Sequence, residues 1–346
     1  MQTAAIDAGP GDFRSLALQI RSTGLLERRP GYYTVKIALT IAALAAGWAA
    51  LVLVGNSWAA LGIAVFLGVM FTQLGFVGHD AGHRQVFGSR RGNRLLGLVV
   101  GNCLIGMSFG WWVPKHDLHH AHPNQIGLDP DIGDGVVAPT STDESAEGGG
   151  RKPFLERHQA LFFFPLMVLR STGIHVLGIQ RLCKRRDRVA AVEGLLIALH
   201  FTLYLAVVFW VLSPVKAVAF IVVQQVVFSV YLGCSFDPNH KAMPVLETDV
   251  QMSFARRQVI TARNVFGGRF TNLLLGGLNY QIEHHLFPTM PRPNLARAQG
   301  MVRAFCLESG FGYCETSLFG SYRQTIAYLR GRAGTPVLVP QGATGA

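Results

Sequence analysis

The stretch IALTIAALAAGWAALVLVGNSWAALGIAVFLGVMFTQLGFVGHDAGH, residues 37–83, decides the fold of this chain. It has no charged side chain from Ile37 to Gly78, and its one turn-like sequence is Gly55-Asn56-Ser57. A helix needs about 20 apolar residues to cross a bilayer, so this run is long enough for two helices joined by a short turn. The stretch therefore predicts a helical hairpin in a membrane, with a pair of histidines at its end.

A second pair of uncharged runs covers residues 194–212 and 217–236. Charged residues are 15% of the 346-residue chain, against about 25% in soluble proteins. We therefore predict an all-α integral membrane protein with four transmembrane helices in two hairpins. The predicted spans are about 37–54, 58–78, 194–212 and 217–236.

Residues 95–113 form a further uncharged run of sufficient length, but they contain four glycines and end in Trp111-Trp112. A crossing there would put the first and second histidine clusters on opposite sides of the membrane. Tryptophan is enriched at the membrane–water interface. We therefore predict that this segment is re-entrant or interfacial.

The basic residues predict an orientation. Every Lys and Arg except Lys216 lies in a segment that two hairpins place on one face, and the positive-inside rule makes that face cytoplasmic. The histidine clusters and both termini fall on the same face, as does a mostly helical cap after residue 236. The net charge of +11 suits an anionic leaflet, so no nucleic-acid partner is expected.

Three histidine clusters hold seven of the 12 histidines. Neutral imidazole is a good ligand for iron and other transition metals, and spacings of three or four residues put side chains on one face of a helix. One metal needs four to six ligands, so this number of histidines indicates two metals. The clusters are His79-Asp80-Ala81-Gly82-His83, His116-Asp117-Leu118-His119-His120 and Gln281-Ile282-Glu283-His284-His285.

The three clusters resemble the histidine boxes of the membrane-bound fatty acid desaturases, HxxxH, HxxHH and [HQ]xxHH. Trp111-Trp112-Val113-Pro114-Lys115-His116 is similar to the lead-in to the second box, and Asp129-Pro130-Asp131 to the run after it. Gln281 at the start of the third box is typical of the front-end subgroup. The resemblance covers about residues 35–310.

The resemblance implies a cytoplasmic helical cap that holds two non-haem iron ions, with O2 as co-substrate and a fatty acyl chain as substrate. We expect an N-terminal cytoplasmic segment (1–35) and a desaturase domain (36–330), and the Gly-, Pro- and Ala-rich composition from residue 331 onward predicts a disordered tail (331–346). The resemblance implies the metal ligands His79, His83, His116, His119, His120, His240, Gln281, His284 and His285. Residues expected to support those ligands are Asp80, Asp117, Asn239 and His122.

The front-end subgroup implies a new double bond between an existing one and the carboxyl end, at a Δ6- or Δ5-like position, as in linoleoyl-CoA desaturases. Residues 1–35 contain no histidine, so a fused cytochrome b5 domain is not expected. Electrons would come from a separate ferredoxin, or from cytochrome b5 with its reductase. A di-iron hydroxylase, a ketolase or a sphingolipid desaturase would share the boxes, and a membrane haem electron carrier is the alternative of a different class.

Overall fold

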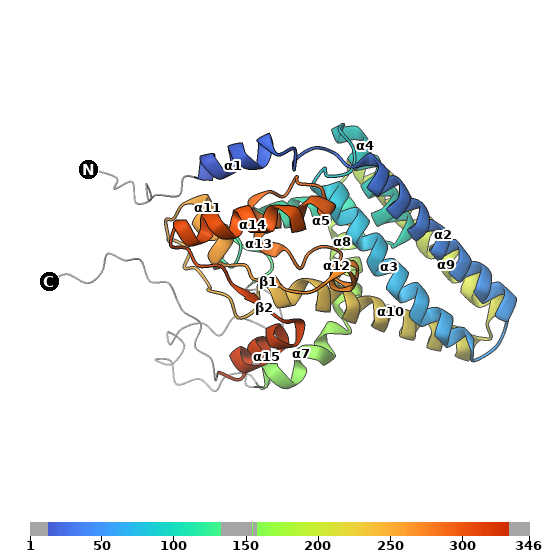
Figure 1. The fold of residues 1–346 in the computed structure, drawn as a ribbon. Helices are drawn as coiled ribbons and strands as arrows, with labels where there is room; N and C mark the ends of the chain where they lie inside the picture. Colours follow the sequence, from blue (N-terminus) through green and yellow to red (C-terminus); the bar gives the residue numbers. More distant parts are fainter. Residues whose placement is uncertain (1–12, 133–153, 155–157, 332–346) are drawn as a thin grey trace. The chain divides into compact units, whose positions relative to one another are not determined.

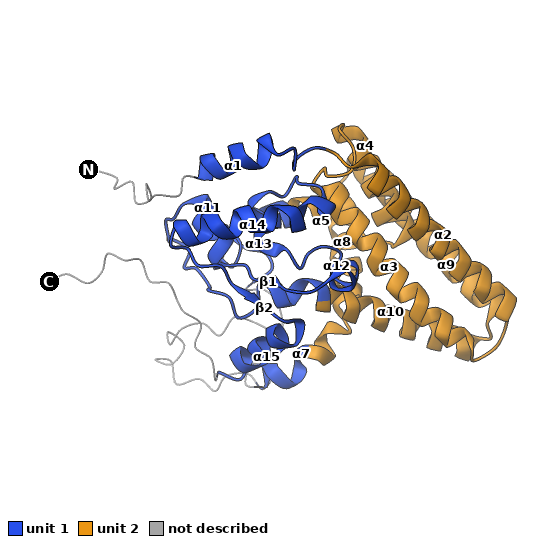
Figure 2. Ribbon diagram, in the orientation of Figure 1, with its two compact units in different colours: residues 1–27, 115–163, 235–346 blue, residues 28–114, 164–234 orange. Residues whose placement is uncertain are grey.

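The computed structural model describes residues 13–132, 154 and 158–331 of the chain. Its regular structure there is helical apart from two strands of two residues each, which confirms the predicted all-α class. Figure 1 shows the helices and strands, coloured along the sequence. Contacts divide the chain into two compact units. Unit 1 consists of Met1–Glu27, Lys115–Phe163 and Ser235–Ala346, and unit 2 of Arg28–Pro114 and Phe164–Cys234 (Figure 2).

Four helices are long and apolar enough to cross a membrane, as predicted, and they supply most of unit 2. Two bent helix pairs also pass this test of length and composition when each pair is taken as one span. By helix length and apolar composition, the chain is therefore an integral membrane protein, as the sequence predicts. The four candidate spans are Pro30–Val54 (α2), Ala60–Gly82 (α3), Arg188–Val211 (α9) and Pro214–Asn239, which joins α10 (Pro214–Phe236) to the 3-10 turn η3 (Asp237–Asn239).

Helix α3 is the most buried of the spans. Of its most apolar window, 56% is buried, against 22% for the windows of α2 and α9. Gly68 allows its close approach to α10, because a Cβ at this position would lie 2.8 Å from the carbonyl oxygen of Gln224. The outer helices expose large apolar side chains such as Leu53 and Trp210, which suits contact with lipid hydrocarbon.

The predicted re-entrant segment 95–113 is not one continuous helix. Helix α4 (Arg90–Gly97) runs into a π-helix, η1 (Leu98–Leu104), and the chain then breaks before α5 (Phe109–Ala121). The two halves meet at an angle of 116°, and Gly106 has a left-handed φ of 71° at the break. This geometry suits a re-entrant loop or a broken span, so re-entry stays a prediction. The second bent pair is α7 (Gln159–Met167) with α8 (Arg170–Lys184).

Unit 1 has its own hydrophobic core, to which four helices each contribute buried side chains such as Ile20, Val259, Ile282 and Val302. A helix as short as six residues is not stable alone in water, so α13 depends on this core for its position. Two parallel strands pair Asn264 with Glu315. The elements are α1 (Phe13–Ser22), α11 (Phe254–Ile260), β1 (Asn264–Val265), α12 (Arg269–Leu274), α13 (Gln281–Leu286), α14 (Arg292–Glu308), β2 (Glu315–Thr316) and α15 (Leu318–Leu329).

Two spans begin earlier in the chain than the charge pattern predicts. Helix α2 begins at Pro30 and includes Lys36, whose ammonium donates to Gln73 Oε1 at 2.6 Å. Helix α9 begins at Arg188 and includes Glu193, which is buried. Residues 1–12 of the predicted N-terminal segment and residues 332–346 of the predicted tail lie outside the described residues.

Candidate metal centre

The second histidine cluster lies on α5 and buries all three of its imidazoles, those of His116, His119 and His120. The Nε2 atoms of His116 and His120 are 3.2 Å apart. Two ligands at right angles, each about 2.1 Å from one metal ion, would be about 3.0 Å apart. This pair of nitrogens is therefore spaced as two ligands of one ion.

The third cluster lies on α13, where His284 and His285 are buried and their ring planes make an angle of 88°. The His120 ring is stacked on that of His285, with centroids 4.2 Å apart, and its centroid is 4.8 Å from that of His284. The ligand nitrogens of His116, His120 and His284 all lie within 4.8 Å of one another. They form the first group of metal-capable nitrogens in unit 1.

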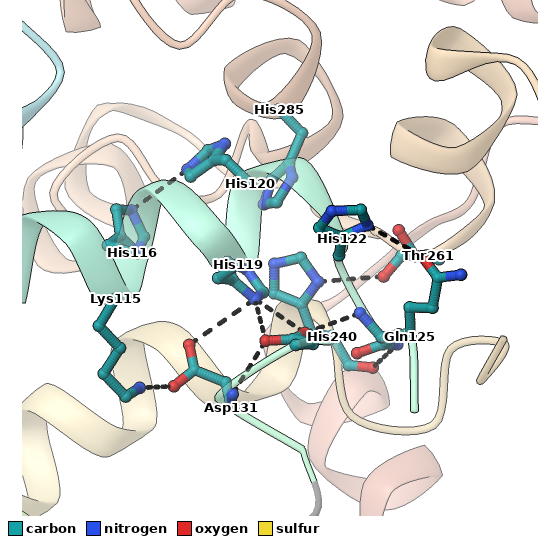
Figure 3. Close-up of polar contacts among 12 residues, drawn as sticks. Lys115, His116, His119, His120, His122, Gln125, Asp131, His240, Thr261 and His285 are labelled. Atoms are coloured by element: carbon teal, nitrogen blue, oxygen red, sulfur yellow. Dashed lines mark hydrogen bonds and ion pairs between the residues drawn. The ribbon is translucent and has the colours of Figure 1, made fainter. Parts of the chain in front are cut away.

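A second group in unit 1 joins residues from three separate segments, His119, His240 and His285 (Figure 3). Their ligand nitrogens also lie within 4.8 Å of one another. The ring centroid of His240 is 4.7 Å from those of both His119 and His285. Since His119 and His120 are neighbours on α5, and His284 and His285 on α13, each of these two helices contributes to both groups, whereas His240 follows the 3-10 turn η3.

Each imidazole of the second group has a hydrogen-bond partner at Nδ1. His119 bonds to Asp129 Oδ2 at 3.0 Å, His240 to the Thr261 carbonyl at 3.0 Å and His285 to Gln258 Oε1 at 2.8 Å. These acceptors place the proton on Nδ1 and leave the lone pair on Nε2. Histidine ligands in metal sites have this arrangement, so the three residues of the second group fit an imidazole-bound ion.

The pKa values of two of these imidazoles lie on opposite sides of the ordinary value. Burial opposes the charged form of His119, but the hydrogen bond to Asp129 and the charges of Asp131 and Asp129 outweigh it and raise the pKa. Burial lowers the pKa of His240 to about 3, and the charge of His119 acts in the same direction. His240 is therefore neutral at physiological pH, which is the form that binds a metal.

Gln281 and Asn239 meet the second group at His240. The Gln281 amide Nε2 is 2.9 Å from His240 Nε2, and Asn239 Nδ2 donates to Gln281 Oε1 at 3.3 Å. Asn239 Nδ2 also donates to the Leu278 carbonyl at 3.0 Å, which fixes the orientation of its amide. The structure thus places both predicted residues beside His240.

In unit 2, the first cluster lies at the C-terminal end of α3. His79 and His83 are buried with ring centroids 4.6 Å apart, and the Trp112 ring centroid is 5.7 Å from that of His79. Asp80, a predicted supporting residue, is also buried and lies 3.4 Å from His79 Nδ1. The Tyr33 hydroxyl donates to the other oxygen of this carboxylate at 3.1 Å.

The other predicted supporting residues lie differently. Asp117 is on the exposed side of α5. His122 Nδ1 donates to Gln125 Oε1 at 3.1 Å, away from both groups (Figure 3). Asp131 is 3.7 Å from His119 Nδ1 and also forms an ion pair with Lys115. The supporting roles of Asp117 and His122 stay predictions.

Two buried side chains beside the histidines, Asp129 and Gln258, were not predicted to have a role, and a third buried side chain, Glu283, lies next to His284 in the third cluster. Glu283 accepts from Asn264 Nδ2 and from the Tyr313 hydroxyl, both at 2.7 Å. Burial raises the pKa of Glu283 to about 7, although these two hydrogen bonds act in the opposite direction. The run Asp129-Pro130-Asp131 was visible in the sequence, but no motif marks Gln258.

The chain is similar to known proteins of one family. A family model described as fatty acid desaturase matches residues 56–317. One similar protein is the acyl-lipid (9-3)-desaturase of Physcomitrium patens, with 31% identity over 89% of this chain. Two others are from Caenorhabditis elegans. They are the Delta(5) fatty acid desaturase fat-4, with 30% identity over 92% of this chain, and the Delta(6)-fatty-acid desaturase fat-3, with 29% identity over 93%. This chain spans 60%, 73% and 74% of these relatives, respectively.

Proposed function

Since the chain belongs to the fatty acid desaturase family, a family of oxidoreductases, we propose that it forms a cis double bond in a fatty acyl chain. The relatives named Delta(5) and Delta(6) support a new bond between an existing one and the carboxyl end. The reaction removes two hydrogens from adjacent methylenes. Two electrons and two protons from the substrate, with two electrons from a donor and two protons from solution, reduce O2 to two molecules of water.

The proposed centre holds two iron ions, because unactivated methylenes have no acidic proton or leaving group and need a redox metal. Bound iron would supply the oxidising power for C–H cleavage. The observation that carries this assignment is the convergence of His119, His240 and His285 with every Nδ1 bonded to an acceptor. The chain's own residues orient these three imidazoles through the acceptors at Nδ1.

We assign His116, His120 and His284 to one ion and His119, His240 and His285 to the other. In this proposal His79 and His83 are also iron ligands. Its support is that both imidazoles are buried at the end of α3 with their ring centroids 4.6 Å apart. Gln281 acts at the second ion beside His240, as a ligand or as a partner of bound water.

We further propose that the histidine clusters face the cytoplasm. The positive-inside rule supports this orientation, since the basic residues lie outside the candidate spans with few exceptions. The net charge of +11 would favour an acidic electron carrier, a ferredoxin or cytochrome b5 with its reductase.

Product analysis tests this function. The gene is expressed in a host that lacks polyunsaturated fatty acids and is fed linoleate, and fatty acids are analysed by mass spectrometry. We expect a product with one additional double bond on the carboxyl side of the existing ones. An oxygenated product would contradict desaturation and indicate a hydroxylase.

His284→Ala removes a proposed ligand and is compared in this assay with His158→Ala, the matched control. His158 lies outside the clusters, and its Nδ1 bonds to the Phe154 carbonyl at 2.8 Å. Product is expected with the control and not with His284→Ala. Equal product from both variants would contradict the ligand assignment.

A further inference from the structure

Helix α9 carries an acidic side chain in an otherwise apolar candidate span. Glu193 is only 1% exposed and lies in unit 2. An ionisable group inside a membrane span is costly, so it is retained where it has partners and a role. Its Oε2 accepts hydrogen bonds from Ser108 Oγ at 2.9 Å, from the Gly110 backbone N–H at 3.0 Å and from Asn102 Nδ2 at 3.3 Å.

These partners lie at the start of α5, the helix that carries the second histidine cluster. The first backbone N–H groups of a helix have no partner within it and need acceptors elsewhere. Phe109 N–H donates to Asn102 Oδ1 at 3.0 Å, Gly110 N–H to Glu193, and Trp111 N–H to Ser108 Oγ at 3.2 Å. The whole first turn is thus capped by a network of three side chains around one carboxylate.

The carboxylate supplies what α5 itself lacks. No acidic residue lies in the first turn of α5, although negative charge is favourable at the N-terminal end of a helix dipole. Pro114 lies inside α5 and cannot donate a hydrogen bond to Gly110, so the first turn has fewer internal bonds. The hydrogen bonds from Asn102, Ser108 and Glu193 therefore contribute more to the stability of this first turn than in a helix without an internal proline.

Gly110 leaves the space that the Glu193 carboxylate occupies. A Cβ at position 110 would lie 2.1 Å from Glu193 Oε1, so any side chain there would displace the acid or the start of the helix. The two residues are 83 positions apart in the sequence. The close approach ties α9 to the first turn of α5.

We propose that Glu193 is a positioning residue for the metal centre. It fixes the first turn of α5 and, through this helix, the direction of His116, His119 and His120. The inference rests on the proposed function, because it takes these histidines as ligands. It adds a side chain from the membrane span that touches no ligand but determines how well the ligands bind.

Cobalt(II) binding to the full-length, iron-free protein in detergent tests the proposal, because the visible bands of cobalt report ligand geometry without turnover. Glu193→Leu should shift these bands and weaken cobalt binding by about tenfold or more, as for loss of other supporting groups. Gly110→Ala should shift the bands and weaken cobalt binding as well, because its methyl group would clash with the Glu193 carboxylate. The double variant Gly110→Ala/Glu193→Asp should recover much of the binding, because the shorter acid makes room for the methyl group.

Gln224→Leu is the matched control, since Gln224 is a fully buried polar residue of α10 that accepts from Tyr204. It should lower the melting temperature and leave the cobalt bands unchanged. Bands that change equally in the control, or no rescue by the double variant, would overturn the inference. Absence of cobalt bands in the unaltered protein would contradict the proposed centre itself, and the inference with it.

Discussion

Two histidines, one in each unit, have the same hydrogen bond and different surroundings. His240 in unit 1 and His200 in unit 2 each bond through Nδ1 to a backbone carbonyl at 3.0 Å. The ring of His200 lies among the aromatic rings of Phe71, Phe201 and Tyr204. The ring of His240 lies among imidazoles. A bonded, buried histidine is therefore not evidence of a metal site by itself; the convergence of several is.

Away from the first histidine cluster, unit 2 has buried polar groups that join its helices. Ser171 bonds to Ser229, and Tyr204 donates to Gln224 at 3.3 Å. In unit 1, by contrast, buried polar groups such as Asp129 and Gln258 accept from histidines. The two units therefore predict different consequences for the same kind of substitution.

The largest difference is expected between His240→Ala and His200→Ala. Loss of a group that supports a ligand costs about 10–100-fold in affinity or activity, so loss of the ligand itself should cost about 100-fold or more. His240→Ala should therefore lose metal and product, while His200→Ala lowers the melting temperature and keeps both. Metal analysis of both purified variants, with product assays, checks this. Equal loss of metal from the two variants would contradict the expected difference between His240 and His200.

A smaller effect is expected from Gln258→Leu. Gln258 accepts from His285 Nδ1 and donates to the His120 carbonyl at 3.0 Å, so it ties the two histidine-bearing helices together. Its loss should weaken metal binding by about 10–100-fold. Titration of the iron-free protein with cobalt(II) measures this, with Gln224→Leu in unit 2 as the control. An unchanged affinity would show that the His285 ring needs no partner.

Asp129→Asn should have a milder effect. Asparagine keeps an oxygen that can accept from His119 Nδ1, but it removes a negative charge that stabilises the positive charge of the metal and ligand. We expect metal affinity to fall by about tenfold, at the lower end for such groups. The same cobalt titration measures it, with Asp249→Asn for comparison, since Asp249 is exposed and belongs to neither group of metal-capable nitrogens. A larger loss than in Gln258→Leu would reverse the expected order.

The smallest effect concerns the core of unit 1. Ile282→Val on α13 removes one buried methyl group and should cost about 0.5–1.5 kcal/mol of stability with little change in metal content. Leu53→Ala on α2, where the side chain is 87% exposed, should cost less. Thermal unfolding in detergent compares the two. A large loss of metal in Ile282→Val would show that metal binding depends on the exact position of α13 in this core.

The candidate spans and the histidine clusters were predictable because their patterns are local. A run without charge or a spacing of four residues is visible in the sequence. The starts of α2 and α9 were not, because Lys36 and Glu193 each have a buried partner that only the folded chain provides. A charge ends an apolar run in the sequence without ending the helix.

The partners of the histidines were equally hidden. Thr261 contributes a carbonyl that any residue has, and Gln258 lies 27 positions from His285. Their role arises from tertiary contacts of α11 with α13, which no short motif encodes. The ligand types could be predicted, whereas the groups that orient them required the structure.

The central claim is that these histidines hold two iron ions, and iron stoichiometry tests it most directly. The protein is purified from cells grown with iron, and iron per chain is measured together with the visible spectrum. The account predicts about two irons per chain, no Soret band, and loss of iron in His240→Ala but not in His200→Ala. A Soret band, or an iron-free chain that forms product, would contradict it.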